Sequence, residues 1–191
     1  MNQVLVNSIS AMEKGKPESL LGNFVADACL NIAIKNYKPE SGNGIDFCML
    51  NNGGLRSSLP SGAVTRKNVF ELMPFENELV VLTIPGNSVS KILKYISDAG
   101  GVPVSNLRMK ISGNSFTDVF ISGQPFNSSM TYKLVTSDYL ANGGDAMQVL
   151  SENIHLERLN IKVRDAIIDY MISINSISDT LKPVLDGRIS K

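Results

Sequence analysis

Histidine is scarce in this sequence, and its scarcity limits the chemistry that the chain can perform. The 191 residues contain one histidine, His155, which lies between Glu152 and Glu157. A two-metal hydrolytic site needs several His, Asp and Asn ligands that converge on a pair of cations, and we interpret His155 as a solvated loop residue. The metalloprotease, P-loop and nucleophile-elbow motifs are also missing from the sequence. We therefore expect no catalytic residue, no metal ligand and no cofactor in this chain, and no bond cleavage by the chain alone.

A net charge is missing as well. Lysine and arginine together number 18, as do aspartate and glutamate, so the formal charge is zero. This balance argues against a nucleic-acid polymer as partner, because a phosphate backbone demands a cationic surface. It remains compatible with a single nucleotide, which needs only one or two local cations.

Long apolar runs and abundant cysteines are missing too. No apolar run approaches the length of a membrane span. The N-terminus lacks a signal-peptide pattern, as it also would in a trimmed piece of an exported protein. The two cysteines, Cys29 and Cys48, are most simply small buried hydrophobes, and the sequence leaves open whether they are paired.

The remaining composition is that of one compact domain, with 43% apolar residues. We expect a single domain over residues 1–191, in which residues 1–17 form a leader or linker. Apolar residues at helical spacing predict helices over 19–34, 65–72, 88–99 and 161–174. Short β-prone runs predict strands over 46–50, 79–84, 108–112, 116–121 and 131–136. This order predicts an α+β (mixed α/β) fold with layered helices over a mixed sheet.

The most informative segment is 137–145, which reads Ser-Asp-Tyr-Leu-Ala-Asn-Gly-Gly-Asp after the strand 131–136. The aromatic ring of Tyr139 offers a flat face on which a base can stack. Gly143 and Gly144 let the backbone turn sharply and approach a ligand closely. Asp145 can accept hydrogen bonds from hydroxyls. The plainer alternative is that the two glycines form an ordinary turn.

Two further segments carry complementary groups. Asn51-Asn52-Gly53-Gly54-Leu55-Arg56 follows the short strand 46–50 and ends in a guanidinium, and Pro74 precedes the aromatic Phe75. An amide, an arginine, two aromatic rings and a carboxylate suit a nucleoside. The rings would sandwich the base, the amide would read its edge and the carboxylate would hold the ribose.

Two polar features allow more than one interpretation. Asn23, Asp27 and Asn31 fall four residues apart on one face of the first helix, which we interpret as a solvated face, or else as a face toward a ligand or partner. The run Asp186-Gly187-Arg188 favours a turn, although it could also place a cation at the ligand site.

Taken together, these ordered motifs resemble a known family. Gly22-Asn23 with Ala26-Asp27-Ala28, then Asn-x-Gly-Gly-Leu-Arg, then Met-Pro-Phe, then Asp-Tyr-Leu-Ala-Asn-Gly-Gly-Asp are similar to the C-terminal domain of the 5′-nucleotidases. That group includes UDP-sugar hydrolases and 2′,3′-cyclic-nucleotide phosphodiesterases. The resemblance extends from about residue 18 to residue 189.

The resemblance implies a role for each matching residue. It implies that Phe75 and Tyr139 clamp the base, Asn51 hydrogen-bonds the base, Arg56 lies near the phosphate and Asp145 binds ribose. The substrate-binding residues expected on this basis are Asn51, Gly53, Gly54, Arg56, Phe75, Tyr139, Asn142, Gly143 and Asp145. It also implies a protein exported to the periplasm or cell surface.

Three departures from the family pattern stand out. Tyr139 occupies a position that is usually phenylalanine, which keeps the stacking face and adds a hydroxyl. The segment Lys14-Gly15-Lys16-Pro17 lacks the arginine often found there, and lysine offers no bidentate fork to a phosphate. The N-terminal metallophosphoesterase domain with its divalent metal pair is not in this sequence.

The resulting hypothesis is a nucleotide-recognition domain of a 5′-nucleotidase-type phosphohydrolase, whose two-metal site lies on another domain or a separate chain. Two alternatives remain open at this stage. One is a stand-alone nucleotide- or nucleoside-binding protein without a catalytic partner, and the other is a structural module that binds no ligand.

Overall fold

The computed structural model describes residues 1–39, 44–178 and 180–191. Its centre is a five-stranded mixed sheet with the strand order β10-β4-β9-β2-β5. These strands are β10 (His155–Lys162), β4 (Glu78–Pro85), β9 (Thr131–Ser137), β2 (Phe47–Met49) and β5 (Val104–Ser105). β2 runs parallel to β9, whereas β4 is antiparallel to both β9 and β10. The mixed α/β fold predicted from the sequence is confirmed.

The central sheet is buried on both faces, and β4 shows why its sequence is almost continuously apolar. Successive side chains of a strand point to opposite faces. Leu79 and Val81 accordingly join one hydrophobic cluster, whereas Val80, Leu82 and Ile84 join the other. All five are fully buried.

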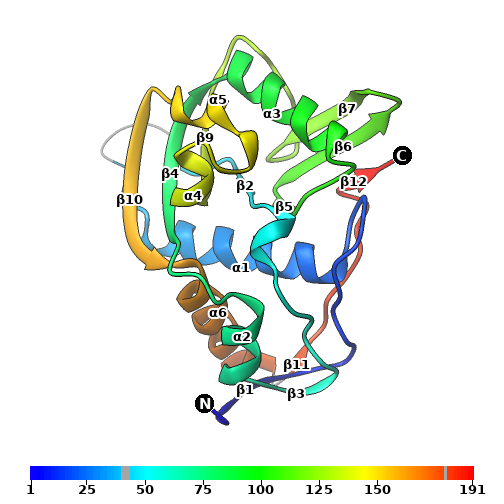
Figure 1. Cartoon of the computed structure of the whole chain (residues 1–191), viewed down its shortest axis with the longest axis vertical. Coiled ribbons are helices and arrows are strands. Elements are labelled where there is room, and N and C mark those ends of the chain that lie inside the picture. The colour runs from blue at the N-terminus through cyan, green and yellow to red at the C-terminus, as the bar shows by residue number, and fades with distance from the viewer. Residues whose placement is uncertain (40–43, 179) are drawn as a thin grey trace.

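Helices cover both faces of this sheet. On one face lie α1 (Leu20–Asn36) and α6 (Val163–Ser178), and on the other lies α3 (Gly86–Asp98). In Figure 1, α1 crosses the middle of the molecule, with α6 and α2 (Arg66–Leu72) below it and α3 near the top. The hydroxyl of Ser19 caps α1 by accepting a hydrogen bond from the N–H of Gly22 at 3.0 Å.

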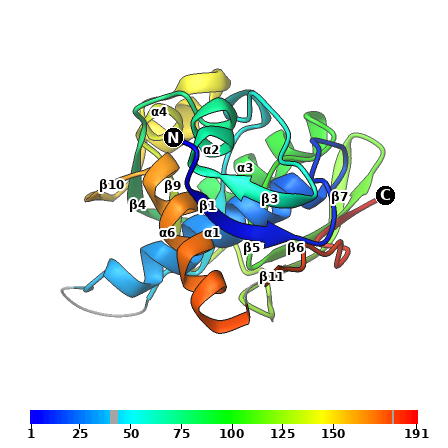
Figure 2. The ribbon, with the colours of Figure 1, turned by 90° about the horizontal axis from the view of Figure 1, so that it is seen from below.

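Two smaller sheets flank this core. One has the order β11-β1-β3 and the other the order β12-β6-β7-β8. Their strands are β11 (Thr180–Leu181), β1 (Val4–Ser8), β3 (Gly62–Thr65), β12 (Ile189–Ser190), β6 (Leu107–Ser112), β7 (Ser115–Ile121) and β8 (Gln124–Pro125). Seen from below, β1 and β3 lie side by side with α6 next to β1 (Figure 2). The predicted strands 108–112 and 116–121 are β6 and β7, which form a hairpin that turns at Gly113 with φ +58°.

Three sequence-based expectations are corrected here. The segment expected to be a leader or linker contains β1, whose Leu5 and Val6 are buried in the core. His155 begins β10 rather than lying in a loop, although its side chain is 60% exposed. The last helix begins at Val163 and not at residue 161, because Lys162 still pairs with Glu78 in the sheet.

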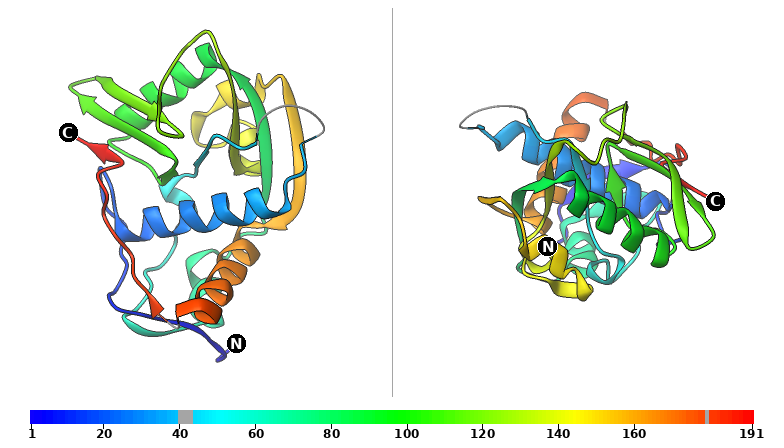
Figure 3. Two further views of the ribbon diagram at one scale, coloured as in Figure 1. Left: turned by 180° about the vertical axis from the view of Figure 1, so that it is seen from behind. Right: turned by 90° about the horizontal axis from the view of Figure 1, so that it is seen from above.

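Two members of the polar row of α1, Asn23 and Asp27, are held by the C-terminal segment. Asn23 is only 4% exposed, and its amide donates hydrogen bonds to Glu18 at 2.5 Å and to the carbonyl of Val184 at 3.0 Å. In Figure 3 (left) the C-terminal segment passes across α1 near the N-terminal end of the helix, where it contacts the first two members of this row. Asp27 binds Arg188 of that segment, and Gly187 turns the chain there with φ +72°.

Candidate functional site

Three loops meet at one edge of the central sheet and enclose a cavity of about 300 Å³. β2 and β9 are parallel neighbours, so their carboxyl ends reach the same edge. β4 is antiparallel to β9, and its first residues lie beside the end of β9 through the pair Leu79 and Ser137. The topology therefore brings together the loops that follow β2, precede β4 and follow β9. The cavity is lined by Asn51, Gly53, Gly54, Arg56, Phe75, Asn77, Tyr139 and Asp145.

Seven of the nine residues expected to bind a substrate line this cavity. The other two, Asn142 and Gly143, are not among its lining residues. They form the turn after the short helix α4 (Asp138–Ala141), where the N–H of Asn142 donates to the carbonyl of Asp138 and Gly143 has φ +88°. Asn77 lines the cavity and was missed, although its place two residues after Phe75 was a usable signal.

The carboxylate of Asp145 is the polar centre of the cavity. Its Oδ2 accepts a hydrogen bond from the amide of Asn51 at 2.6 Å, and its Oδ1 accepts one from the hydroxyl of Tyr139 at 2.8 Å. Each carboxylate oxygen has two lone pairs, so each retains capacity for a further donor. The hydrogen bond to Asp145 raises the pKa of the Tyr139 hydroxyl above its ordinary value.

The two aromatic side chains are unusually accessible for their size. Phe75 is 40% exposed and Tyr139 is 42% exposed. Exposed rings in a concave site offer faces for stacking, which a buried ring cannot do. The cavity therefore combines stacking surfaces with convergent hydrogen-bonding groups, the usual composition of a small-molecule site.

The loop that carries Phe75 is fixed by ion pairs to the start of α6. The carboxylate of Glu76 accepts hydrogen bonds from Lys162 and, at 2.5 Å, from Arg164. These contacts, the bond from Lys162 first, lower the pKa of Glu76 from 4.5 to about 2. The N–H of Val163 also donates to the carbonyl of Asn77 at 2.9 Å. The residues that follow Phe75 are thus held by partners almost ninety positions away in sequence.

Arg56 brings positive charge to the cavity. Its backbone N–H donates to the carbonyl of Leu72 at 2.8 Å, which holds the loop. Its guanidinium makes one long contact, 3.5 Å, to the carbonyl of Gly53 and has no acidic partner within the described part of the chain. Most of its donors are therefore free for an anionic ligand. Arg188, the other cation considered from the sequence, does not line this cavity.

Metal-ligating and thiol groups do not assemble at this site. Across residues 1–39, 44–178 and 180–191, no three His, Cys, Asp or Glu side chains are arranged to hold a metal ion. Cys29 and Cys48 are free and buried, and burial raises the pKa of the Cys29 thiol to about 12. Within the same residues, no helix has the length and apolar character needed to cross a membrane.

Over residues 2–152 the chain matches the family model described as "5'-nucleotidase, C-terminal domain", and it therefore belongs to this family. The resemblance drawn from the ordered motifs is confirmed.

Individual relatives agree with this assignment. The chain is 34% identical to Protein UshA of Yersinia enterocolitica over 107 residues, which cover 53% of the chain and 20% of that protein. It is 26% identical to the trifunctional nucleotide phosphoesterase protein YfkN of Bacillus subtilis over 193 residues, which cover 91% of the chain and 12% of that protein. A solved 5'-nucleotidase precursor from Thermus thermophilus superposes with a TM-score of 0.84 at 25% identity, over 98% of the chain and 39% of that structure. The chain thus spans a fifth or less of the two curated relatives.

Proposed function

We propose that this chain recognises nucleotides for a phosphohydrolase of the 5′-nucleotidase type. The observation that carries the proposal is the convergence of Phe75, Tyr139, Asn51 and Asp145 on one cavity from three separate loops. Two accessible rings, an amide and a carboxylate are the groups that a base and a ribose require. Arg56 adds the cation that a phosphate requires.

The contacts suggest how each part of the ligand is held. The base enters between the rings of Phe75 and Tyr139, and the amides of Asn51 and Asn77 lie on the cavity wall where they can read its edge. The ribose hydroxyls donate to the unused lone pairs of Asp145, which is already oriented by Asn51 and Tyr139. The guanidinium of Arg56 then meets the phosphate side of the ligand.

Hydrolysis itself is assigned to a two-metal site on another domain or chain. The names of the relatives, among them a nucleotide phosphoesterase and 5'-nucleotidases, support nucleotide hydrolysis as the reaction that this chain serves. Bound divalent cations activate water and stabilise the charge of the leaving phosphate. The same kinship supports export to the periplasm or cell surface.

The proposal is tested by measuring binding and hydrolysis separately. Calorimetric titration with adenosine, AMP, uridine, UMP and UDP-glucose should show binding of at least one of them. Phosphate release from AMP and UDP-glucose should stay at background for the chain alone with Mn²⁺, Zn²⁺ or Mg²⁺. It should rise when the matching metallophosphoesterase is added. Chelator-sensitive turnover by the chain alone, after re-purification, would contradict the division of labour, and no binding in any titration would contradict nucleotide recognition.

A further inference from the structure

The loop that carries Asp145 has an unfavourable backbone conformation. Asp145 and Ala146 follow one another with φ angles of +52° and +61°, in the left-handed region. The Cβ atom makes this region unfavourable for residues other than glycine, and the exposed methyl group of Ala146 has no polar atom that could offset this. Two such residues in succession persist only where surrounding contacts hold them. The hydrogen bonds of Asp145 are therefore needed to keep this loop in place.

One hydroxyl group makes two of these bonds. The hydroxyl of Tyr139 donates to Oδ1 of Asp145 at 2.8 Å and accepts a hydrogen bond from the backbone N–H of Asp145 at 3.3 Å. It thus restrains the side chain and the backbone of the same residue. The amide of Asn51 donates to the other carboxylate oxygen, Oδ2, at 2.6 Å. A phenylalanine has no hydroxyl, so at position 139 it would leave the N–H and the Oδ1 of Asp145 without these partners.

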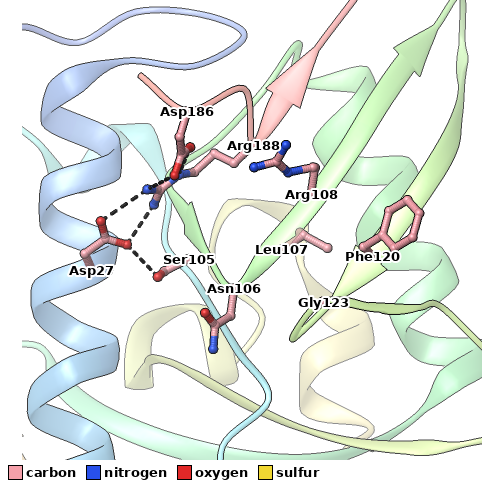
Figure 4. Close-up of a pocket in the computed structure, with 9 residues that line it drawn as sticks. All are labelled: Asp27, Ser105, Asn106, Leu107, Arg108, Phe120, Gly123, Asp186 and Arg188. Carbon is pink, nitrogen blue, oxygen red and sulfur yellow. Dashed lines mark hydrogen bonds and ion pairs between the residues drawn. The ribbon is translucent and has the colours of Figure 1, made fainter. Parts of the chain in front are cut away.

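Asp27 and Asp145 are held in different ways. Asp27 lies in the wall of a second cavity, of about 650 Å³, where its two oxygens accept hydrogen bonds from the guanidinium of Arg188 at 2.7 Å and 3.2 Å (Figure 4). Its charge is therefore compensated by a cation of the protein. Asp145 is bonded to neutral donors and forms no ion pair with any residue in the described ranges. Its negative charge is available to the hydroxyl groups of a ligand, and hydrogen bonds to a charged oxygen are strong.

We propose that the hydroxyl of Tyr139 is a positioning group for ribose recognition, which makes the site prefer a ribonucleoside to the same nucleoside without ribose hydroxyls. It holds the carboxylate of Asp145 in the conformation that receives the 2′- and 3′-hydroxyl groups of the ligand. The hydroxyl acts through Asp145, whereas the ring of Tyr139 acts on the base by stacking. This inference rests on the nucleotide recognition proposed for the same cavity.

The test compares ligands that differ only in the ribose hydroxyls. The parent chain is titrated with adenosine, with uridine and with the 2′,3′-dideoxy analogue of each, by calorimetry or by ligand-observed saturation-transfer NMR. The parent should bind the ribonucleoside about tenfold more tightly than its analogue, because hydrogen bonds to a carboxylate are lost in the analogue. Tyr139→Phe should weaken the ribonucleoside about threefold, since Asn51 still holds Asp145. The affinity of the dideoxy analogue should stay unchanged, which also shows that the variant is folded and still stacks the base.

A second substitution tests whether the hydroxyl acts by holding the loop. Glycine adopts the left-handed conformation without a steric penalty. Ala146→Gly, introduced into the Tyr139→Phe variant, should therefore return the affinity for the ribonucleoside to that of the parent. The matched control is Ala63→Gly in the same variant. Ala63 is an exposed residue of β3 outside the left-handed region and outside the cavity, and its replacement should restore nothing.

Three results would overturn the positioning role while leaving nucleotide recognition intact. One is an equal loss of the ribonucleoside and its dideoxy analogue in Tyr139→Phe. Another is tighter binding of the ribonucleoside by Tyr139→Phe, which would mean that the hydroxyl occupies the place of a ribose hydroxyl. The third is the absence of any recovery in the variant that also carries Ala146→Gly. A parent chain that binds neither nucleoside nor analogue would instead contradict the proposed function, and this inference with it.

Discussion

The hydroxyl of Tyr139 and Asp145 are bound to each other twice. The hydroxyl donates to Oδ1 of Asp145 at 2.8 Å, and the backbone N–H of Asp145 donates back to the same hydroxyl oxygen at 3.3 Å. The ring of Tyr139 lies very close to Gly144. A Cβ atom added at Gly144 would be 2.5 Å from the Cε1 atom of that ring. The hydroxyl that distinguishes Tyr139 from phenylalanine thus fixes both the ring and the carboxylate of the site.

This packing predicts the effect of Gly144→Ala. The added methyl group has to displace the ring of Tyr139, because contacts below 3.0 Å are not tolerated. We expect nucleoside binding to weaken about tenfold, measured by calorimetry, with little change in stability because the ring is exposed. Gly44→Ala, where a Cβ meets no atom within 4 Å, is the control. Unchanged affinity in Gly144→Ala would show that the position of the ring is unimportant.

The ion pairs of Glu76 predict a pH-dependent stability. Its pKa is about 2 in the folded protein, against 4.5 for a glutamate side chain without these partners. A carboxylate whose pKa is lowered by folding stabilises the folded state at pH values above its pKa in the unfolded chain. This contribution is lost as the pH falls through its pKa in the folded protein. The stability gap between the parent and Glu76→Gln, measured by urea unfolding, should therefore be constant from pH 7 to about 5 and shrink from pH 4.5 toward 2.

The control for this experiment is Glu71→Gln. Glu71 is exposed and lies 3.6 Å from Lys67. Removal of the Glu71 charge should therefore leave the pH dependence of the unfolding free energy nearly unchanged. A gap for Glu76→Gln that does not narrow below pH 4.5 would count against the ion pairs. Because Glu76 adjoins Phe75, nucleoside binding should also weaken modestly in Glu76→Gln at neutral pH.

Arg188→Gln should be strongly destabilising. The side chain of Arg188 is about 10% exposed and joins α1, β5 and the C-terminal segment. Breaking a buried ion pair from one side leaves a carboxylate without its partner and typically costs about 3 kcal/mol. Urea unfolding should show this loss, whereas Arg108→Gln, an exposed neighbour, should lie within about 0.5 kcal/mol of the parent. Similar stabilities of the two variants would refute the anchoring role.

Arg56→Ala separates phosphate recognition from base recognition. A charge-assisted contact contributes roughly 1.5–3 kcal/mol. We therefore expect Arg56→Ala to weaken the binding of a nucleoside monophosphate at least tenfold more than the binding of the free nucleoside. Both affinities are measured by calorimetry at the same salt concentration. Equal losses for both ligands would assign Arg56 to bracing its loop through the bond to Leu72.

Local sequence patterns predicted the four longest helices and the strands β2, β4, β6, β7 and β9, but not β10 of the central sheet. Short motifs predicted most of the residues that line the cavity. The apolar run of β4 and the helix that begins beside Thr65 are local signals, and the structure has both. The strand β1 was missed because its apolar run is too short to show a period. Leu5 and Val6 become buried in the fold in which β3 and β11 pair with β1.

Long-range contacts explain the other misses. The sequence left open whether the polar row of α1 faces solvent or a partner, because the residues that bind Asn23 and Asp27 lie some 160 positions away. Asn77 was missed although it follows Phe75 closely, and the fixing of Phe75 by Lys162 and Arg164 is likewise a contact between distant residues. The order of the motifs indicated which residues line one cavity. The contacts that position these residues are visible only in the fold.

The most direct test is calorimetric titration of a nucleoside into the parent chain and its clamp variants. Stacking contributes roughly 1–3 kcal/mol per base, so Phe75→Ala and Tyr139→Ala should each weaken binding about tenfold or more. Tyr139→Phe keeps the ring and should lose much less. Lys110→Gln, in β6 and outside the lining of this cavity, should match the parent. If both alanine variants bind like the parent, or the parent binds no nucleoside, this cavity is not the nucleotide site.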